Sequence, residues 1–90
     1  MDDIRLKRIR LRAWRRGFRE ADLILGPFAD QYGPNLTEAQ LDAFEALLNE
    51  ADQDVYGWII GREPAPAAHD TDVLAMLKAF EPAQGGPRGA

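Results

Sequence analysis

Glycine and proline divide this 90-residue chain into short segments, and within each segment the apolar residues recur at helical spacing. Gly17, Gly33-Pro34, Gly61 and Glu81-Pro82 are the clearest breaks. No segment shows the alternation of a strand, and there is no internal repeat. The pattern predicts an all-α protein, a small five-helix bundle with a single domain at residues 1–81 and a disordered Gly/Pro-rich tail at residues 82–90.

The first predicted helix, residues 3–16, is strongly basic. Acidic Asp2 and Asp3 lie at its start, where the helix dipole favours negative charge, and Gly17 is suited to end it in a left-handed conformation. Its apolar stripe is formed by Leu6, Ile9 and Ala13, and the adjacent cationic stripe by Arg5, Arg8, Arg12 and Arg15.

The second predicted helix runs from Phe18 to about Tyr32, with a kink or break expected at Gly26-Pro27 because proline removes an N–H group and clashes with the preceding turn. We expect its core face to consist of Leu23, Ile24, Phe28 and Tyr32.

The third helix has the best-marked start, since Thr37 and Gln40 form a capping box, and it should end near Glu50. Leu41, Phe44, Leu47 and Leu48 are its predicted core residues. A stiff Pro/Ala connector at residues 63–68 separates the last two helices. These are predicted at residues 53–60, capped by Asp52, and at residues 70–80, capped by Asp70 or His69.

Charge is divided unevenly along the chain. The net charge is −4, but residues 1–20 carry +5 and residues 21–90 carry −9. Such asymmetry favours an electrostatic partner for the basic part, while the simpler interpretation is that the basic helix is neutralised by its own fold. For the basic helix, binding to a protein partner is the favoured role. The alternatives are a charged face that is only solvated, nucleic acid bound through Arg5, Arg8 and Arg12, and a membrane surface.

Catalytic and metal-binding chemistry has little support in the composition. There is no Cys, and His69 is the single His, so thiolate catalysis, disulfides and multi-His metal sites are excluded. We interpret His69 as a helix cap or surface residue, and Asp52 and Asp54 as helix N-terminal acids rather than calcium ligands. No apolar run approaches the roughly 18 residues of a membrane span, and no secretory signal is present. We therefore expect a soluble, monomeric, cytoplasmic protein, complete from Met1, that is not an enzyme.

The stretch from Trp14 to Glu20 combines arginines, a glycine, a carboxylate and aromatic side chains. One interpretation is a helix end with a local ion pair, worth about 0–1 kcal/mol if exposed. The other is a docking site, in which Gly17 lets a partner backbone approach while Arg16 and Glu20 make charge-assisted hydrogen bonds. Both can hold at once. Tyr56 is expected near this surface, and Trp58 in the core.

The same residues carry a family resemblance. Arg16, Gly17 and Glu20 match the R-G-x-x-E hallmark of the SdhE family, the small succinate dehydrogenase flavinylation (FAD assembly) factors, and the resemblance covers about residues 6–80. A second block at residues 52–59 also matches, as do Pro27-Phe28 and Leu36-Thr37. Phe18 stands where the family usually has Met, and Gly57 where it has a polar helix-former.

The resemblance implies a five-helix bundle that is not itself an enzyme. It implies binding to the flavoprotein subunit of succinate dehydrogenase, and to that of fumarate reductase, and promotion of covalent FAD attachment there, with no cofactor stably bound by the factor. The implied docking centre is Arg16, Gly17 and Glu20, surrounded by Arg12, Arg15, Arg19, Asp54 and Tyr56. The alternative function is a small basic-helix nucleic-acid-binding domain.

Overall fold

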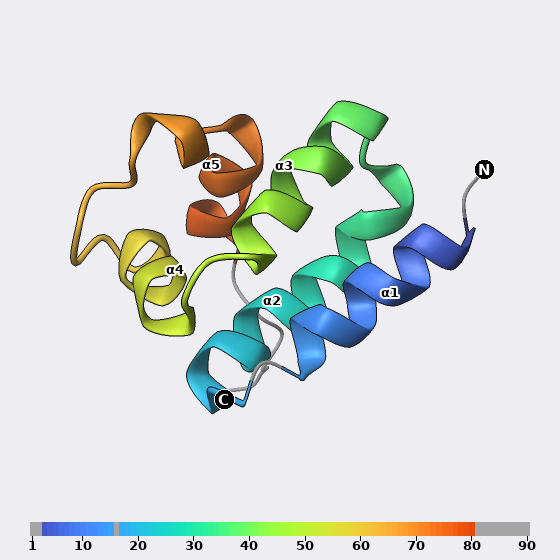
Figure 1. Ribbon diagram of the computed structural model, residues 1–90, viewed down its shortest axis with the longest axis horizontal. Coiled ribbons are helices and arrows are strands. Elements are labelled where there is room, and N and C mark those ends of the chain that lie inside the picture. The colour runs from blue at the N-terminus through green and yellow to red at the C-terminus, as the bar shows by residue number, and fades with distance from the viewer. Residues whose placement is uncertain (1–2, 16, 81–90) are drawn as a thin grey trace.

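The computed structural model describes residues 3–15 and 17–80 and shows a helical protein (Figure 1). Its α-helices are α1 (Asp3–Trp14), α2 (Arg19–Tyr32), α3 (Glu38–Leu48), α4 (Asp52–Ile59) and α5 (Asp72–Ala79). Two 3-10 turns, η1 (Gly33–Asn35) and η2 (Ala67–His69), lie between them. The described residues contain no strand, so the predicted all-α five-helix fold is confirmed. The tail predicted at residues 82–90 lies outside the described residues.

Helix α2 is the central element of the packing. It lies beside α1 along most of its length and also contacts α4 and α5, while α3 packs against α1, α4 and α5 (Figure 1). The short loop at Gly17 joins α1 to α2, which makes the two helices neighbours in space as well as in sequence.

The core is formed by apolar residues from all five helices, with Phe28 of α2 at an aromatic cluster. Its ring centroid lies 5.2 Å from that of Tyr32, 5.5 Å from that of Phe44 and 5.6 Å from that of Phe80. Among the described residues, no polar or charged side chain is buried. Helix association in this fold therefore depends mainly on apolar burial.

Helix α3 forms as its sequence predicts. The Thr37 hydroxyl accepts a hydrogen bond from the Gln40 backbone N–H at 3.1 Å, and the Gln40 side chain accepts one from the Thr37 N–H at 2.9 Å, which completes the capping box. All four predicted core residues of this helix are buried: Leu41, Phe44, Leu47 and Leu48.

Two parts of the prediction for α2 are wrong. The helix is not broken at Gly26-Pro27, since it continues through Pro27, and Leu23 is 48% exposed rather than in the core. Phe28 is buried as predicted, and the other buried side chains of the helix are those of Ala21, Leu25 and Ala29. Ile24 and Tyr32 are half-buried against the core. Because Leu23, Ile24 and Leu25 are consecutive apolar residues, the inward face depends on what packs against the helix.

Two predicted helix caps are also wrong. Asp52 is the first helical residue of α4, and the N-cap position is Ala51. Helix α5 is capped by Thr71, whose hydroxyl accepts a hydrogen bond from the Leu74 N–H at 3.3 Å, and not by Asp70 or His69. Thr71 is better suited to cap this helix, because Leu74, whose N–H its hydroxyl accepts, is three residues further along the chain.

His69 has a role that the sequence did not indicate. It lies in the connector between α4 and α5, within η2, where its ring stacks on Trp58 at a centroid distance of 5.4 Å. Its Nε2 lies 3.1 Å from a carboxylate oxygen of Glu50. His69 is therefore neither a cap nor a plain surface residue, because it holds the connector against the end of α3 and against α4. Trp58 is buried, as predicted.

Candidate functional site

The turn between α1 and α2 is the centre of the candidate site. Gly17 has φ +87°, and a β-carbon built on it would meet no atom within 4 Å. The predicted left-handed conformation is confirmed, and the space above this backbone is open. Arg15 and Gly17 are both exposed. Arg16, the remaining residue of the turn, lies outside the described residues.

An aromatic contact fixes this turn against α4. Phe18 is half-buried, and its ring meets that of Tyr56 edge-on, with centroids 5.2 Å apart and an interplanar angle of 75°. Edge-to-face pairs of this kind add about 0.5–1.5 kcal/mol beyond their area burial. Tyr56 therefore lies beside the Arg-Gly turn, where the sequence analysis expected it.

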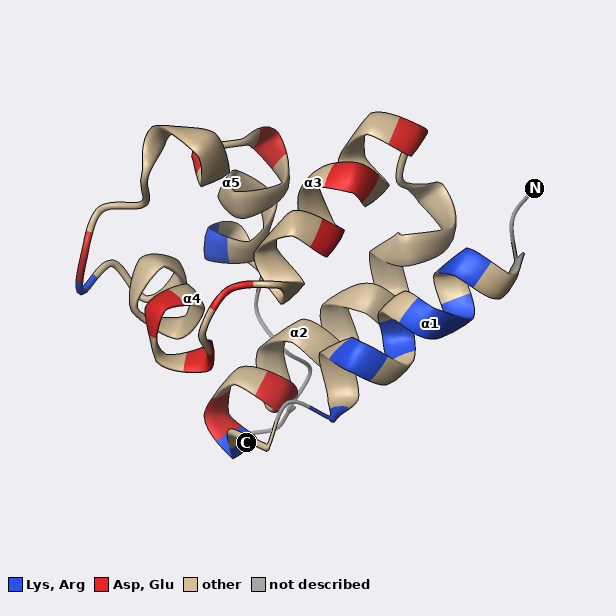
Figure 2. Ribbon diagram, in the orientation of Figure 1, with Lys and Arg blue, Asp and Glu red and all other residues tan. Residues whose placement is uncertain are grey.

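Charged side chains surround the turn. Arg19 and Glu20 are exposed in the first turn of α2, and Asp54 is exposed in the first turn of α4. Acidic positions mark the starts of both helices in the ribbon (Figure 2). An exposed carboxylate at a helix N-terminus is stabilised there by the helix dipole and still has oxygens available to a partner. Arg19 and Glu20 present both signs of charge within three residues of the open backbone at Gly17, and Asp54 lies two residues before Tyr56 on α4.

Arg12 and Arg15 line the neighbouring hollow. The Arg12 guanidinium donates a hydrogen bond to the Asn49 side-chain oxygen at 2.6 Å, which ties α1 to the end of α3. The hollow has a volume of about 330 Å³ and is lined by Arg12, Arg15, Leu48, Glu50 and Asp52. It lies beside the turn because Arg15 is two residues before Gly17.

Arg5 uses its charge within the fold. Its guanidinium contacts Asp42 and lies 2.8 Å from both Glu38 and Glu45, all on α3. Hydrogen bonds to Asp42 and Glu45 raise the pKa of Arg5 above its ordinary value. For Arg5, neutralisation by the protein's own acidic residues is therefore the correct interpretation, and nothing favours the nucleic-acid alternative that needed this residue.

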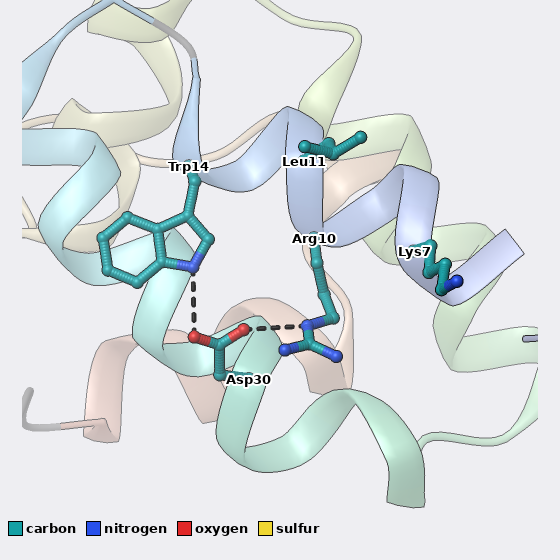
Figure 3. Close-up of a pocket in the computed structure, with 5 residues that line it drawn as sticks. All are labelled: Lys7, Arg10, Leu11, Trp14 and Asp30. Carbon is teal, nitrogen blue, oxygen red and sulfur yellow. Dashed lines mark hydrogen bonds and ion pairs between the residues drawn. The ribbon is translucent and has the colours of Figure 1, made fainter. Parts of the chain in front are cut away.

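A second group of residues was missed by the sequence analysis. Asp30 of α2 accepts hydrogen bonds from Arg10 Nε at 2.9 Å and from the Trp14 indole N–H at 3.1 Å (Figure 3). Together with Lys7 and Leu11 these residues line a pocket of about 410 Å³. The signal was present in the spacing of Lys7, Leu11 and Trp14, which recur at i, i+4 and i+7 on one helical face.

The described residues show no arrangement typical of a metal centre. No group of three or more His, Cys, Asp or Glu side chains is close enough to hold a metal ion within residues 3–15 and 17–80. In the same part of the chain, no helix has the length and apolar character needed to cross a membrane.

The fold and the turn define a small all-helical protein whose candidate site is an exposed surface formed by a glycine turn, charged side chains and a supporting aromatic pair. Residues 7–81 match the protein family described as flavinator of succinate dehydrogenase, and the chain belongs to this family.

Relatives in animals and fungi support the assignment. The chain is 36% identical over 80 residues to succinate dehydrogenase assembly factor 2, mitochondrial, of Danio rerio, covering 87% of this chain and 51% of that protein. It is 35% identical to the corresponding factor 2-B of Drosophila ananassae (84% and 48% covered) and 42% identical to factor 2 of Scheffersomyces stipitis (86% and 56% covered). The chain thus spans about half the length of the curated relatives it matches.

Proposed function

We propose that this protein is an assembly factor that binds the flavoprotein subunit of succinate dehydrogenase and promotes covalent attachment of FAD to it. Family membership supports the proposal, as do the relatives named succinate dehydrogenase assembly factor 2. The flavoprotein subunit of fumarate reductase is a further proposed partner. We propose that the factor acts as a monomer in the cytoplasm.

The observation that carries the docking site is the open backbone at Gly17. A positive φ with no atom within 4 Å of a built β-carbon leaves open space at Gly17 for the approach of a partner. Glu20, Arg15 and Arg19 are exposed next to it and suited to charge-assisted hydrogen bonds. In this proposal Arg16, Gly17 and Glu20 form the docking centre, surrounded by Arg12, Arg15, Arg19, Asp54 and Tyr56.

The proposed role requires no catalytic group from this protein. Flavin attachment is chemistry of the cofactor and of the subunit that carries it, and it depends on orientation. A small protein that binds one arrangement of the flavoprotein more tightly than others raises the population of that arrangement. We propose that FAD is not stably bound by the factor.

The test uses purified succinate dehydrogenase flavoprotein subunit, lacking covalent FAD, mixed with FAD and this protein. Binding is measured by calorimetry, and attachment by the flavin fluorescence of the denatured subunit on a gel. Wild type should bind and increase attachment, while Gly17→Arg and Glu20→Ala should fold normally by circular dichroism and lose most of both. Glu63→Ala, at an exposed position after α4, is the matched control for Glu20→Ala. Normal binding and attachment by Gly17→Arg would refute the site.

A further inference from the structure

Helix α1 has two apolar faces, and only one of them is buried in the protein. Ile9 and Ala13 are fully buried. On the other side, Ile4 is 64% exposed, Leu11 54% and Trp14 41%. These three residues are spaced i, i+7, i+10, which places them on one face of the helix. A surface helix needs only one apolar stripe to pack against its own core, so the second stripe is unexplained by the fold.

This exposed face continues onto α2 through Trp14. The indole ring lies directly over Gly26, because a β-carbon there would be only 2.3 Å from the ring. Leu23, which is 48% exposed, precedes Gly26 by three residues, and Glu20 precedes Leu23 by three. Residues three apart share a helix face. Leu11, Trp14 and Leu23 therefore form one apolar strip, which we name the α1–α2 strip, and it ends at Glu20 of the docking centre.

The pocket beside the strip combines an apolar wall with a free cation. Leu11 and Trp14 provide the apolar wall, while both oxygens of Asp30 are engaged by Arg10 and Trp14 (Figure 3). Lys7 makes no ion pair with any described residue, and it lines the same pocket. The pocket is therefore suited to an apolar side chain that is accompanied by a carboxylate.

A stable complex with the flavoprotein would also need to bury more surface than the Gly17 turn alone provides. A stable complex buries about 800 Å² on each partner, contributed by about 20–30 residues. The eight residues proposed for the docking site are fewer than this, so a stable complex of ordinary size needs further surface. The α1–α2 strip adjoins the docking centre and carries large apolar side chains of the kind found at interface centres.

We propose that the docking surface for the flavoprotein subunit extends from the Gly17 turn along the α1–α2 strip. The flavoprotein segment that covers the strip would carry an apolar side chain, seated against Leu11 and Trp14, next to an Asp or Glu that pairs with Lys7. This inference rests on the proposed function, because it takes the same flavoprotein as the partner.

A membrane surface fits the strip less well. The Trp14 indole N–H is already bonded to Asp30, and its ring lies against α2, so it is held in place and cannot insert deeply into lipid. The exposed stripe of α1 is also short, since it contains only Ile4, Leu11 and Trp14 as large exposed apolar residues in the described part of that helix.

The test measures the affinity of purified flavoprotein subunit for variants of the strip and for matched controls. Leu11→Asp and Leu23→Asp should each weaken binding about tenfold or more, and Lys7→Glu should weaken it by a similar factor. Changes of this size are typical of interface residues that contribute substantially to the binding energy. The controls are Ile60→Asp, at a residue that is 50% exposed, and Lys78→Glu in α5. Both controls should bind within about twofold of wild type.

The outcomes separate this inference from the proposed function. If wild type binds, Gly17→Arg does not, and the strip variants bind like wild type, the inference is overturned and the proposed function stands. If wild type does not bind the flavoprotein at all, both fail. Sedimentation with vesicles of phosphatidylcholine and phosphatidylserine provides the remaining comparison. Binding to vesicles that is lost in Leu11→Asp, without an effect on flavoprotein affinity, would identify the strip as a membrane surface and overturn the inference.

Discussion

The indole ring of Trp14 lies against the backbone of Gly26 so closely that no β-carbon fits between the two helices. A β-carbon at residue 26 would lie 2.3 Å from Cδ2 and 2.4 Å from Cε2 of the ring. Glycine inside a helix costs about 1 kcal/mol relative to alanine, so alanine would ordinarily stabilise α2. Here we expect Gly26→Ala to destabilise the protein by about 1–3 kcal/mol, because the ring or the helix must move. Urea denaturation measures the change.

A double-mutant cycle isolates the cause of that destabilisation. In a Trp14→Ala background the ring is absent, so Gly26→Ala should become neutral or stabilising. If Gly26→Ala costs the same with and without the ring, the contact between Trp14 and Gly26 does not explain the glycine.

The ion pairs between α1 and α3 predict that two arginines of α1 contribute unequally to thermal stability. Arg5 contacts three carboxylates and its side chain is only 18% exposed, whereas Arg8 is exposed and makes no ion pair with a described residue. Arg5→Gln should therefore lower the melting temperature more than Arg8→Gln does. It leaves Glu38, Asp42 and Glu45 close together on one face of α3 without their cation.

Salt provides the check on this interpretation. The pairs are near the surface, so added NaCl should screen them and reduce the difference between the two variants. Equal melting temperatures for Arg5→Gln and Arg8→Gln at low salt would show that the ion pairs contribute nothing measurable.

Features determined by neighbouring residues were predictable from the sequence. The Thr37–Gln40 capping box is a three-residue relationship, and the core face of α3 follows from its own spacing. The left-handed turn at Gly17 also follows from local chemistry, since glycine is the residue that adopts positive φ without strain. This is why the conformation of the Gly17 turn could be predicted.

Features that depend on tertiary packing were not predictable. Leu23, Ile24 and Leu25 are consecutive, and the choice of Leu25 for the core is made by the elements that pack around α2. The bonds from Arg10 and Trp14 to Asp30 join residues 20 and 16 positions apart, so no local pattern indicates them. Pro27 was expected to kink or break α2; the helix continues through it, and the kink stays a prediction.

The capping box at the start of α3 gives a prediction of stability. Thr37→Ala removes the hydroxyl that accepts the Gln40 N–H at 3.1 Å, and should lower the free energy of unfolding by about 1 kcal/mol. Thr37→Ser keeps the hydroxyl and should cost less. Chemical denaturation distinguishes the two variants, and equal stability of Thr37→Ala and wild type would contradict the role of the cap.

The aromatic cluster predicts a large loss of stability when one of its rings is removed. Phe28 is fully buried and touches three other rings, so Phe28→Ala should cost about 3–5 kcal/mol through lost transfer energy and a residual cavity. Phe80 belongs to the same cluster but is half-buried, and Phe80→Ala should cost clearly less. Equal losses in thermal unfolding would contradict the central position of Phe28.

Substitutions at Gly17 separate the contribution of the turn to folding from its proposed contribution to docking. The open space at Gly17 means that an added side chain meets no neighbour, so the cost of Gly17→Ala comes from the positive φ alone and should be about 1–2 kcal/mol. Gly17→Asn should cost less, because asparagine adopts this conformation more readily. Both variants should fold and retain the Phe18–Tyr56 contact, and differential scanning calorimetry measures their stabilities. A loss much larger than 2 kcal/mol for Gly17→Asn would show that the turn is enclosed rather than open.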